Sequence, residues 1–86
     1  MRFQAALTRE QGVEFAVVAV GPRVVGSTRE ATDAMRAFQR VFAGVPVVLM
    51  AQDGRGRPTY YGRRDIVRFL ASINFGRLPW REYTLN

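Results

Sequence analysis

Two short runs of apolar residues constrain this fold more than any other feature of the sequence. The first extends from Val13 to Val20, and from Phe15 onward both faces of the expected strand are apolar. The second extends from Pro46 to Ala51. Short runs that are apolar on both faces are typical of strands in the middle of a sheet. We therefore expect both runs to be buried strands.

The N-terminal half carries further strand and helix signals. Residues Phe3 to Leu7 alternate in a way that predicts a first strand with one buried face, and Arg9 to Gly12 predicts a turn. After the Gly21-Pro22 break, Arg23 to Val25 is interpreted as a short return strand. A helix is predicted from Ser27 to Ala43, because Ser27 and Glu30 have the spacing of a capping box.

The C-terminal half predicts a hairpin followed by a second helix. Asp53 and Gly54 indicate the hairpin turn, and Arg57 to Tyr61 is expected to pair back. Pro58 has no N–H, which places that strand at an edge or the proline at its start. An apolar stripe at helical spacing predicts a helix over Arg63 to Ile73. The tail after it is compatible with a short strand or with an arm docked on the core.

These elements predict a single small α+β domain over residues 1–77 and a tail over residues 78–86. The expected order is β-β-(β)-α-β-β-α plus the tail. We expect a four- to five-stranded, mostly antiparallel sheet with both helices on one face. The tail is expected to dock on the core or at a subunit interface, through Trp80 and Tyr83.

The residue types that are missing exclude most enzyme chemistry. The 86 residues include no cysteine, no histidine and no lysine. Thiol and imidazole catalysis, Schiff bases and the common zinc sites are therefore excluded. The seven acidic residues fall mostly one to each element, whereas carboxylate catalysis and metal binding need several acids close together. We expect no enzyme activity, no cofactor and no metal.

The chain is strongly basic. Its net charge is +6, and all 13 basic residues are arginine. Arginine suits bidentate binding of phosphate and carboxylate, which favours anion recognition. A general coding bias toward arginine is the preferred explanation of the missing lysines, and anion recognition stays open beside it. With either origin, the surplus attracts polyanions at low salt.

The segment from Gly54 to Arg64 combines charge, aromatic rings and turn residues. It contains four arginines, two tyrosines and no acid. Arg63 and Arg64 open a helix, where cations oppose the helix dipole, and a bound anion would resolve this conflict. The candidate anion or nucleic-acid site consists of Arg55, Arg57, Tyr60, Tyr61, Arg63, Arg64 and Arg68.

The two adjacent tyrosines are expected to point to opposite faces of their strand. One is expected to face the core and the other the solvent. An exposed tyrosine beside arginines can stack a nucleic-acid base. The competing interpretation is a tyrosine that covers the sheet with an arginine stacked on it.

Two functions are compatible with these features. The first is a small non-enzymatic binding module for an anionic ligand, with nucleic acid as the first candidate. The alternative is a homodimeric protein–protein interaction module without a nucleic-acid role, because a small core without disulfides gains stability from self-association. No secretory signal and no membrane-spanning run is found, so we expect a cytoplasmic protein without a membrane partner.

Overall fold

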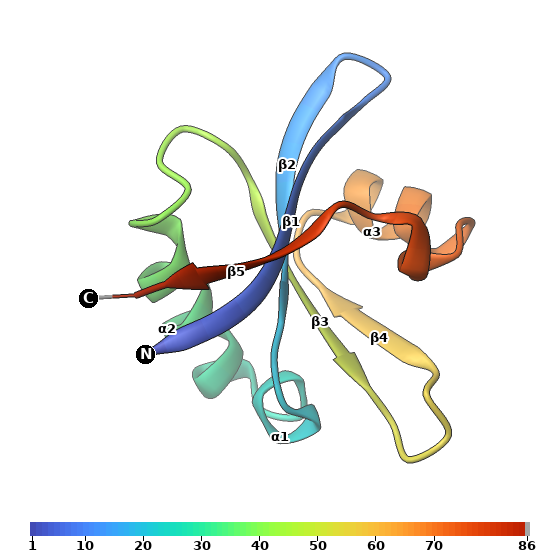
Figure 1. Cartoon of the computed structure of the whole chain (residues 1–86). Helices are drawn as coiled ribbons and strands as arrows, with labels where there is room; N and C mark the ends of the chain where they lie inside the picture. Colours follow the sequence, from blue (N-terminus) through green and yellow to red (C-terminus); the bar gives the residue numbers. More distant parts are fainter. Residues whose placement is uncertain (86) are drawn as a thin grey trace.

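A five-stranded mixed sheet forms the centre of the molecule in the computed structural model, which describes residues 1–85 (Figure 1). Its strands lie in the spatial order β4-β3-β2-β1-β5. They are β1 (Arg2–Glu10), β2 (Val13–Ala19), β3 (Val47–Gln52), β4 (Pro58–Tyr61) and β5 (Trp80–Thr84). Strands β2 and β3 are parallel, and the other three pairs are antiparallel. The predicted α+β class, the strand count and the mostly antiparallel sheet are confirmed.

The helices cover both faces of this sheet. They are α1 (Pro22–Val25), α2 (Thr28–Gln39), α3 (Arg64–Ala71) and the short 3-10 helix η1 (Phe75–Arg77). Helix α2 packs on one face through Ala31 and Phe38, whereas α3 packs on the other through Ile66 and Leu70. The expectation that both helices share one face is therefore wrong.

The central strands explain why both faces must be covered. Val17 and Val48 point into the α3 face, while Val18 and Leu49 point into the α2 face, and all four are fully buried. Strands with apolar side chains on both faces need a layer of other residues on each side. The segment that crosses from β2 to β3 supplies α2, and the segment after β4 supplies α3.

The segment predicted as a short return strand is the helical turn α1. Pro22 occupies its first turn, where a fixed φ and a missing N–H suit a helix start. The amide of Val24 donates to the carbonyl of Gly21 at 3.0 Å, and the amide of Gly26 donates to the carbonyl of Pro22 at 3.3 Å. The two valines of this turn, Val24 and Val25, pack against the α2-face core. Proline chemistry thus outweighs the strand preference of valine.

Side chains at both ends of α2 set its limits. The hydroxyl of Ser27 accepts a hydrogen bond from the amide of Glu30 at 3.3 Å, which confirms the predicted cap. At the other end, the side-chain amide of Gln39 donates to the carbonyls of Phe42 (2.8 Å) and Val45 (2.6 Å). Gly44 adopts a φ of 85° between them, a conformation that favours glycine. These contacts direct the chain into β3.

The tail forms β5 and brings the two ends of the chain together. Strand β5 pairs with β1 so that Tyr83 lies opposite Phe3. Beyond it, the amide of Leu85 donates to the carbonyl of Met1 at 2.8 Å, and the ammonium of Met1 donates to the carbonyl of Leu85 at 3.1 Å. The sheet therefore ends in a strand made from the last residues of the described chain.

None of the helices within residues 1–85 has the length and apolar character that crossing a bilayer requires.

Candidate functional site

The tip of the β3–β4 hairpin is organised by one carboxylate. Oδ1 of Asp53 accepts hydrogen bonds from the amides of Arg55 (2.8 Å) and Arg57 (3.0 Å), and Oδ2 accepts from Nε of Arg57 at 3.2 Å. The hydrogen bond from the amide of Arg57, and to a smaller extent that from the amide of Arg55, lowers the pKa of Asp53. The predicted role of Asp53 in the turn is confirmed, and the charge of Arg57 is used within the hairpin.

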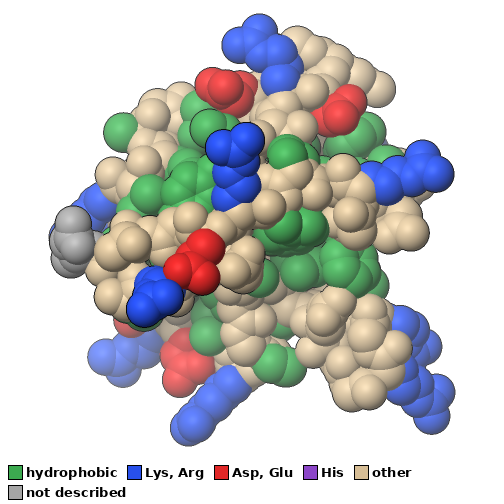
Figure 2. Space-filling model, in the orientation of Figure 1, with side chains coloured by type: hydrophobic (Ala, Val, Ile, Leu, Met, Phe, Trp, Pro, Cys, Tyr) green, Lys and Arg blue, Asp and Glu red, His purple; other side chains and the backbone are tan. Residues whose placement is uncertain are grey.

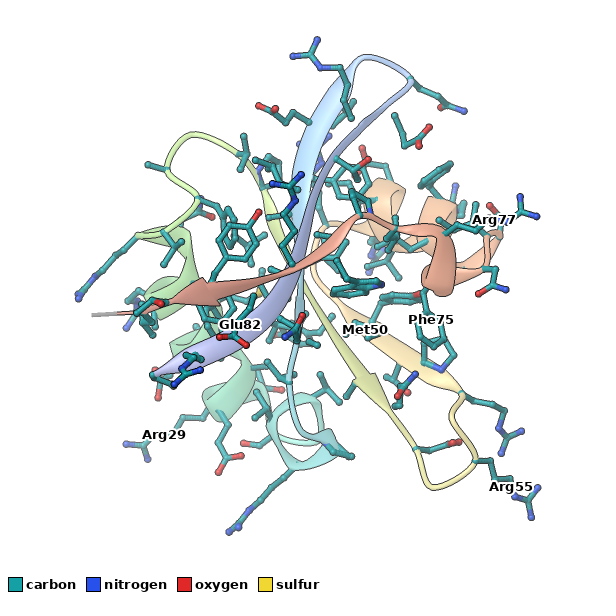
Figure 3. All side chains as sticks on the ribbon, in the orientation of Figure 1. Arg29, Met50, Arg55, Phe75, Arg77 and Glu82 are labelled. Carbon is teal, nitrogen blue, oxygen red and sulfur yellow. The ribbon has the colours of Figure 1, made fainter. Side chains whose placement is uncertain are left out.

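Arg55 projects from this tip, away from the body of the molecule (Figure 3). Its backbone amide is held by Asp53. Its side chain makes no ion pair with a described residue. Arg55 is therefore an isolated charge at the end of a loop.

The start of α3 contains its own anion. The guanidinium of Arg63 donates from Nε and Nη2 to the two carboxylate oxygens of Asp65, at 2.7 and 2.8 Å. This contact lowers the pKa of Asp65 to about 2 and raises that of Arg63. Asp65 lies in the first helical turn, where a negative charge also complements the helix dipole. The conflict that suggested an external anion at Arg63 is thus resolved by a neighbouring residue.

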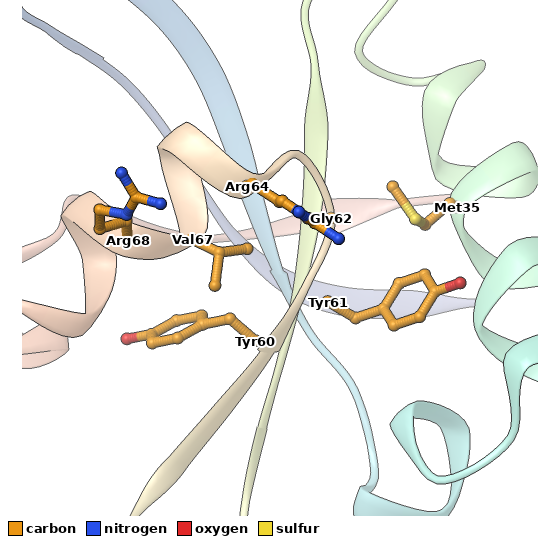
Figure 4. A pocket seen from close by; sticks show the side chains of 7 residues that line it. All are labelled: Met35, Tyr60, Tyr61, Gly62, Arg64, Val67 and Arg68. Atoms are coloured by element: carbon orange, nitrogen blue, oxygen red, sulfur yellow. The ribbon is translucent and has the colours of Figure 1, made fainter.

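Tyr60 and Tyr61 point to opposite faces of β4, as predicted (Figure 4). We expected only one of the two tyrosines to face a core. In the structure both are half-buried, because both faces of the sheet are covered. Tyr61 packs with the α2 face and Tyr60 with the α3 face. The hydroxyl of Tyr60 is buried without a hydrogen-bond partner among the described residues, and burial raises its pKa. Each ring therefore packs partly against one core and stays partly exposed, and stacking of a nucleic-acid base stays a prediction.

A hollow of about 760 Å³ lies beside β4 (Figure 4). Val67 and Arg68 of α3 border it on the side of Tyr60, and Met35 of α2 borders it on the side of Tyr61. The side chain of Arg64 lies next to Gly62, at the end of β4. The residues that line the hollow are Met35, Tyr60, Tyr61, Gly62, Arg64, Val67 and Arg68. We call this hollow the β4 groove.

A close approach between two strands shapes this groove. Gly62 adjoins β3, and a Cβ atom on it would lie 2.9 Å from Cγ2 of Val48 and 3.3 Å from the carbonyl oxygen of Val47. No ordinary side chain fits this space. Glycine therefore lets the chain turn from β4 directly into α3, which places Arg64 at the end of the strand.

The structure brings only part of the predicted site together. Tyr60, Tyr61, Arg64 and Arg68 line the β4 groove, whereas Arg55, Arg57 and Arg63 do not. On the face in Figure 2, most arginine side chains project at separate points; two lie side by side at the lower right, and they do not merge with the others into one patch. Arg64 and Arg68 make no ion pair with any residue of the described chain. They are the two charges available to a ligand in the groove.

Met35, Gly62 and Val67 were not among the predicted site residues. Gly62 lies within the Gly54–Arg64 segment, and Val67 lies within the predicted helix over Arg63 to Ile73. Met35 belongs to α2, and the parallel pairing of β2 and β3 brings that helix near β4. No local signal in the sequence indicates this approach.

The two residues proposed for a subunit interface contact their own chain. The indole Nε1 of Trp80 donates to the carbonyl of Phe75 at 2.8 Å, and the ring packs on the α3-face core. Tyr83 stacks on Phe3 with ring centroids 5.7 Å apart and meets Phe42 edge-on at 5.0 Å. Both rings therefore hold β5 on the sheet. Association of two chains stays a prediction.

Within residues 1–85, the acidic side chains form no cluster that could hold a metal ion. Comparisons with known protein families, with characterised proteins and with solved structures give no match to this chain. The site is therefore interpreted from its own geometry.

Proposed function

We propose that this protein is a non-enzymatic binding module that holds an anionic ligand in the β4 groove. The observation that carries the proposal is the position of Arg64 and Arg68. Both border the groove, and neither has an acidic partner among the described residues. Acids nearby, Asp53 and Asp65, are engaged by Arg57 and Arg63. A guanidinium group without a partner favours carboxylate or phosphate ligands, which it can bind through two hydrogen bonds.

Composition supports a binding role over catalysis. The chain has no cysteine, histidine or lysine, and the groove contains no acidic side chain. Burial raises the pKa of Tyr60, and its hydroxyl is buried without a hydrogen-bond partner among the described residues. The groove therefore presents two guanidinium groups to a ligand but no acid–base pair that could catalyse a reaction.

A titration with defined anions tests this proposal. Isothermal titration calorimetry would measure binding of polyglutamate and of single- and double-stranded oligonucleotides, at low and at near-physiological ionic strength. We expect binding that weakens as salt increases, because exposed charges are screened. A chain that binds none of these anions at low salt would disprove the proposal.

Paired variants locate the site. Arg64→Ala with Arg68→Ala removes both groove charges. Arg29→Ala with Arg40→Ala removes two exposed arginines associated with α2 that also make no ion pair with a described residue. A charge-assisted hydrogen bond contributes about 1.5–3 kcal/mol, so the groove variant should bind about tenfold to a hundredfold more weakly. The control should retain most of the affinity. Equal losses in both variants would mean that net charge, and not the groove, attracts the ligand.

A further inference from the structure

We propose that the ligand of the β4 groove is an extended acidic peptide that joins the sheet as an additional strand beside β4. This inference rests on the proposed function and specifies its ligand. It starts from the position of β4 at the end of the strand order, where the described chain provides a neighbour on one side only. An edge strand offers backbone groups that can pair with another chain.

The register of β4 identifies which backbone groups are available. The amide of Asp53 donates to the carbonyl of Arg57, which fixes a bonded position at the start of the ladder. Because bonded and non-bonded pairs alternate along antiparallel strands, Thr59 and Tyr61 face β3. The N–H and C=O of Tyr60 therefore face outward. Pro58, the other outward residue, has no N–H, so pairing is expected at the Tyr60–Gly62 end.

The β4 groove has two walls that match the two faces of an added strand. Figure 4 shows α3 on the Tyr60 side and Met35 of α2 on the Tyr61 side. Successive side chains of a strand point to opposite faces. A strand lying along β4 would thus send alternate side chains toward α3 and toward Met35.

The walls differ in charge, and this difference defines the peptide. The α3 wall carries Arg68, and Arg64 of the same helix lies next to Gly62 at the end of β4, between the two walls. Neither arginine has an ion-pair partner among the described residues. The opposite wall consists of Met35 and Tyr61, which present a thioether and an aromatic ring. Charge complementarity therefore favours acidic residues toward α3 and apolar residues toward Met35. The expected ligand is a segment in which acidic and apolar residues alternate.

The same charges disfavour the other occupants of this edge. Antiparallel pairing of two β4 edges would place the α3 helices of both copies on the same face, with four arginines near each other. Strand β4 has no acidic residue that could offset this repulsion. A nucleic acid would gain the two arginines, but the rings of Tyr60 and Tyr61 are engaged by the two cores. An extended peptide uses both the arginines and the backbone edge.

The decisive experiment titrates the full chain with a synthetic peptide of alternating glutamate and valine. Calorimetry measures affinity, and amide spectra by NMR report shifts and hydrogen exchange at Tyr60 and Gly62. We expect saturable binding, slower exchange of the Tyr60 amide, and an affinity at least about tenfold lower for the Arg64→Ala, Arg68→Ala variant. The Arg29→Ala, Arg40→Ala variant should bind as the wild type does.

Two control peptides separate charge from strand pairing. A lysine–valine peptide of the same length should not bind. A glutamate–valine peptide that is N-methylated at alternate residues, on the edge that meets β4, keeps its charge but loses backbone donors. It should bind about tenfold or more weakly than its parent. Equal affinity of the methylated and parent peptides would overturn strand addition.

Other outcomes distinguish this inference from the proposed function. Binding of an oligonucleotide but not of the acidic peptide would overturn the peptide and leave an anion site in place. Absence of binding to every anion would overturn both. A dimer whose Tyr60 amide is protected without peptide would show that a second copy occupies the edge, and the peptide proposal would be wrong.

Discussion

Strands β4 and β5 end the same sheet in different ways. Each is held by one aromatic side chain on either face, Tyr60 and Tyr61 in β4 and Trp80 and Tyr83 in β5. Strand β5 also carries charged residues, including Glu82, which pairs with Arg2 of β1 at 3.4 Å. Strand β4 carries no charge, and a groove with arginines from the adjoining helix lies beside it.

This difference indicates which edge is suited to recognition. Charges along an edge strand disfavour pairing with another chain, and a proline does the same at its own position. Strand β5 has Arg81 and Glu82 on opposite faces, whereas β4 has only Pro58 at its start. The far end of β4 is therefore the less protected edge. Four substitutions test the comparison, in order of decreasing effect.

Trp80→Ala is expected to have the largest effect, because it removes a packed ring and the bond from Nε1 to the carbonyl of Phe75. We expect a loss of about 3 kcal/mol in the free energy of unfolding, measured by urea denaturation. Trp80→Phe keeps most of the packing and should lose about 1 kcal/mol. If Trp80→Ala left the free energy of unfolding unchanged, backbone pairing alone would hold β5. The two edge strands would then not share stabilisation by aromatic side chains.

Gly62→Ala tests the close approach that shapes the β4 edge. The added Cβ would lie 2.9 Å from the side chain of Val48, so the start of α3 must shift. We expect a loss of about 2 kcal/mol in stability and weaker ligand binding. At Gly54 in the same hairpin, a Cβ would meet no atom within 4 Å, so Gly54→Ala is the matched control and should be nearly neutral. Similar losses at both glycines would contradict the packing argument.

Tyr60→Phe removes the buried hydroxyl that lacks a partner in β4. Burial of an unpaired polar group is unfavourable, so the variant should be as stable as the wild type or more stable by up to about 1 kcal/mol. Tyr83→Phe in β5 is the control, since that hydroxyl is not sealed in the same way, and it should leave stability unchanged. A clear loss for Tyr60→Phe in thermal denaturation would mean that the hydroxyl makes a stabilising contact, for example with bound water.

Asp65→Asn should give the smallest effect, one that depends on pH. The contact with Arg63 lowers the pKa of Asp65 from 3.8 to about 2. A carboxyl whose pKa is lowered by folding stabilises the fold above its ordinary pKa, and this contribution is lost as the pH falls toward the lowered value. The wild type should therefore be slightly more stable than the variant near neutral pH, and the difference should vanish as the pH falls below about 2.

The urea midpoint as a function of pH measures this difference. Repeating the comparison in an Arg63→Ala background is the control, because most of the effect should then be absent at every pH. A difference that persists unchanged at acid pH would show that the Arg63–Asp65 pair does not stabilise the start of α3.

The sequence was sufficient to predict strands β1 to β4, the two long helices and the cap at Ser27, but for β5 it left a short strand and a docked arm open. It failed at α1, where two valines favoured a strand but Pro22 and the absence of a neighbouring strand favour a helical turn. It also failed on the placement of the helices. The two apolar runs, which have apolar side chains on both faces, already implied a covering layer on each side of the sheet. Which helix covers which face depends on the pairing of β2 with β3, and that pairing joins residues distant in sequence.

The candidate site was predictable only in part, for a related reason. Tyr60, Tyr61, Arg64 and Arg68 lie close in the sequence and also in space. Whether an arginine is neutralised depends on side-chain geometry, and here Asp53 and Asp65 engage Arg57 and Arg63 within their own turns. Met35 reaches the groove from a helix that precedes β3, which no local pattern indicates.

The pairing of Met1 with Leu85 also has a consequence for folding kinetics. The β1–β5 ladder joins the two ends of the described chain, and contacts this distant in sequence carry a large loop-closure entropy and slow the folding of small domains. We expect β5 to dock after the other strands have paired. A circular permutant that links the present ends and opens the chain at Gly21, between β2 and α1, would turn this slowest contact into a local hairpin and keep the β1–β2 and β3–β4 hairpins intact. Its folding should be faster than that of the natural order.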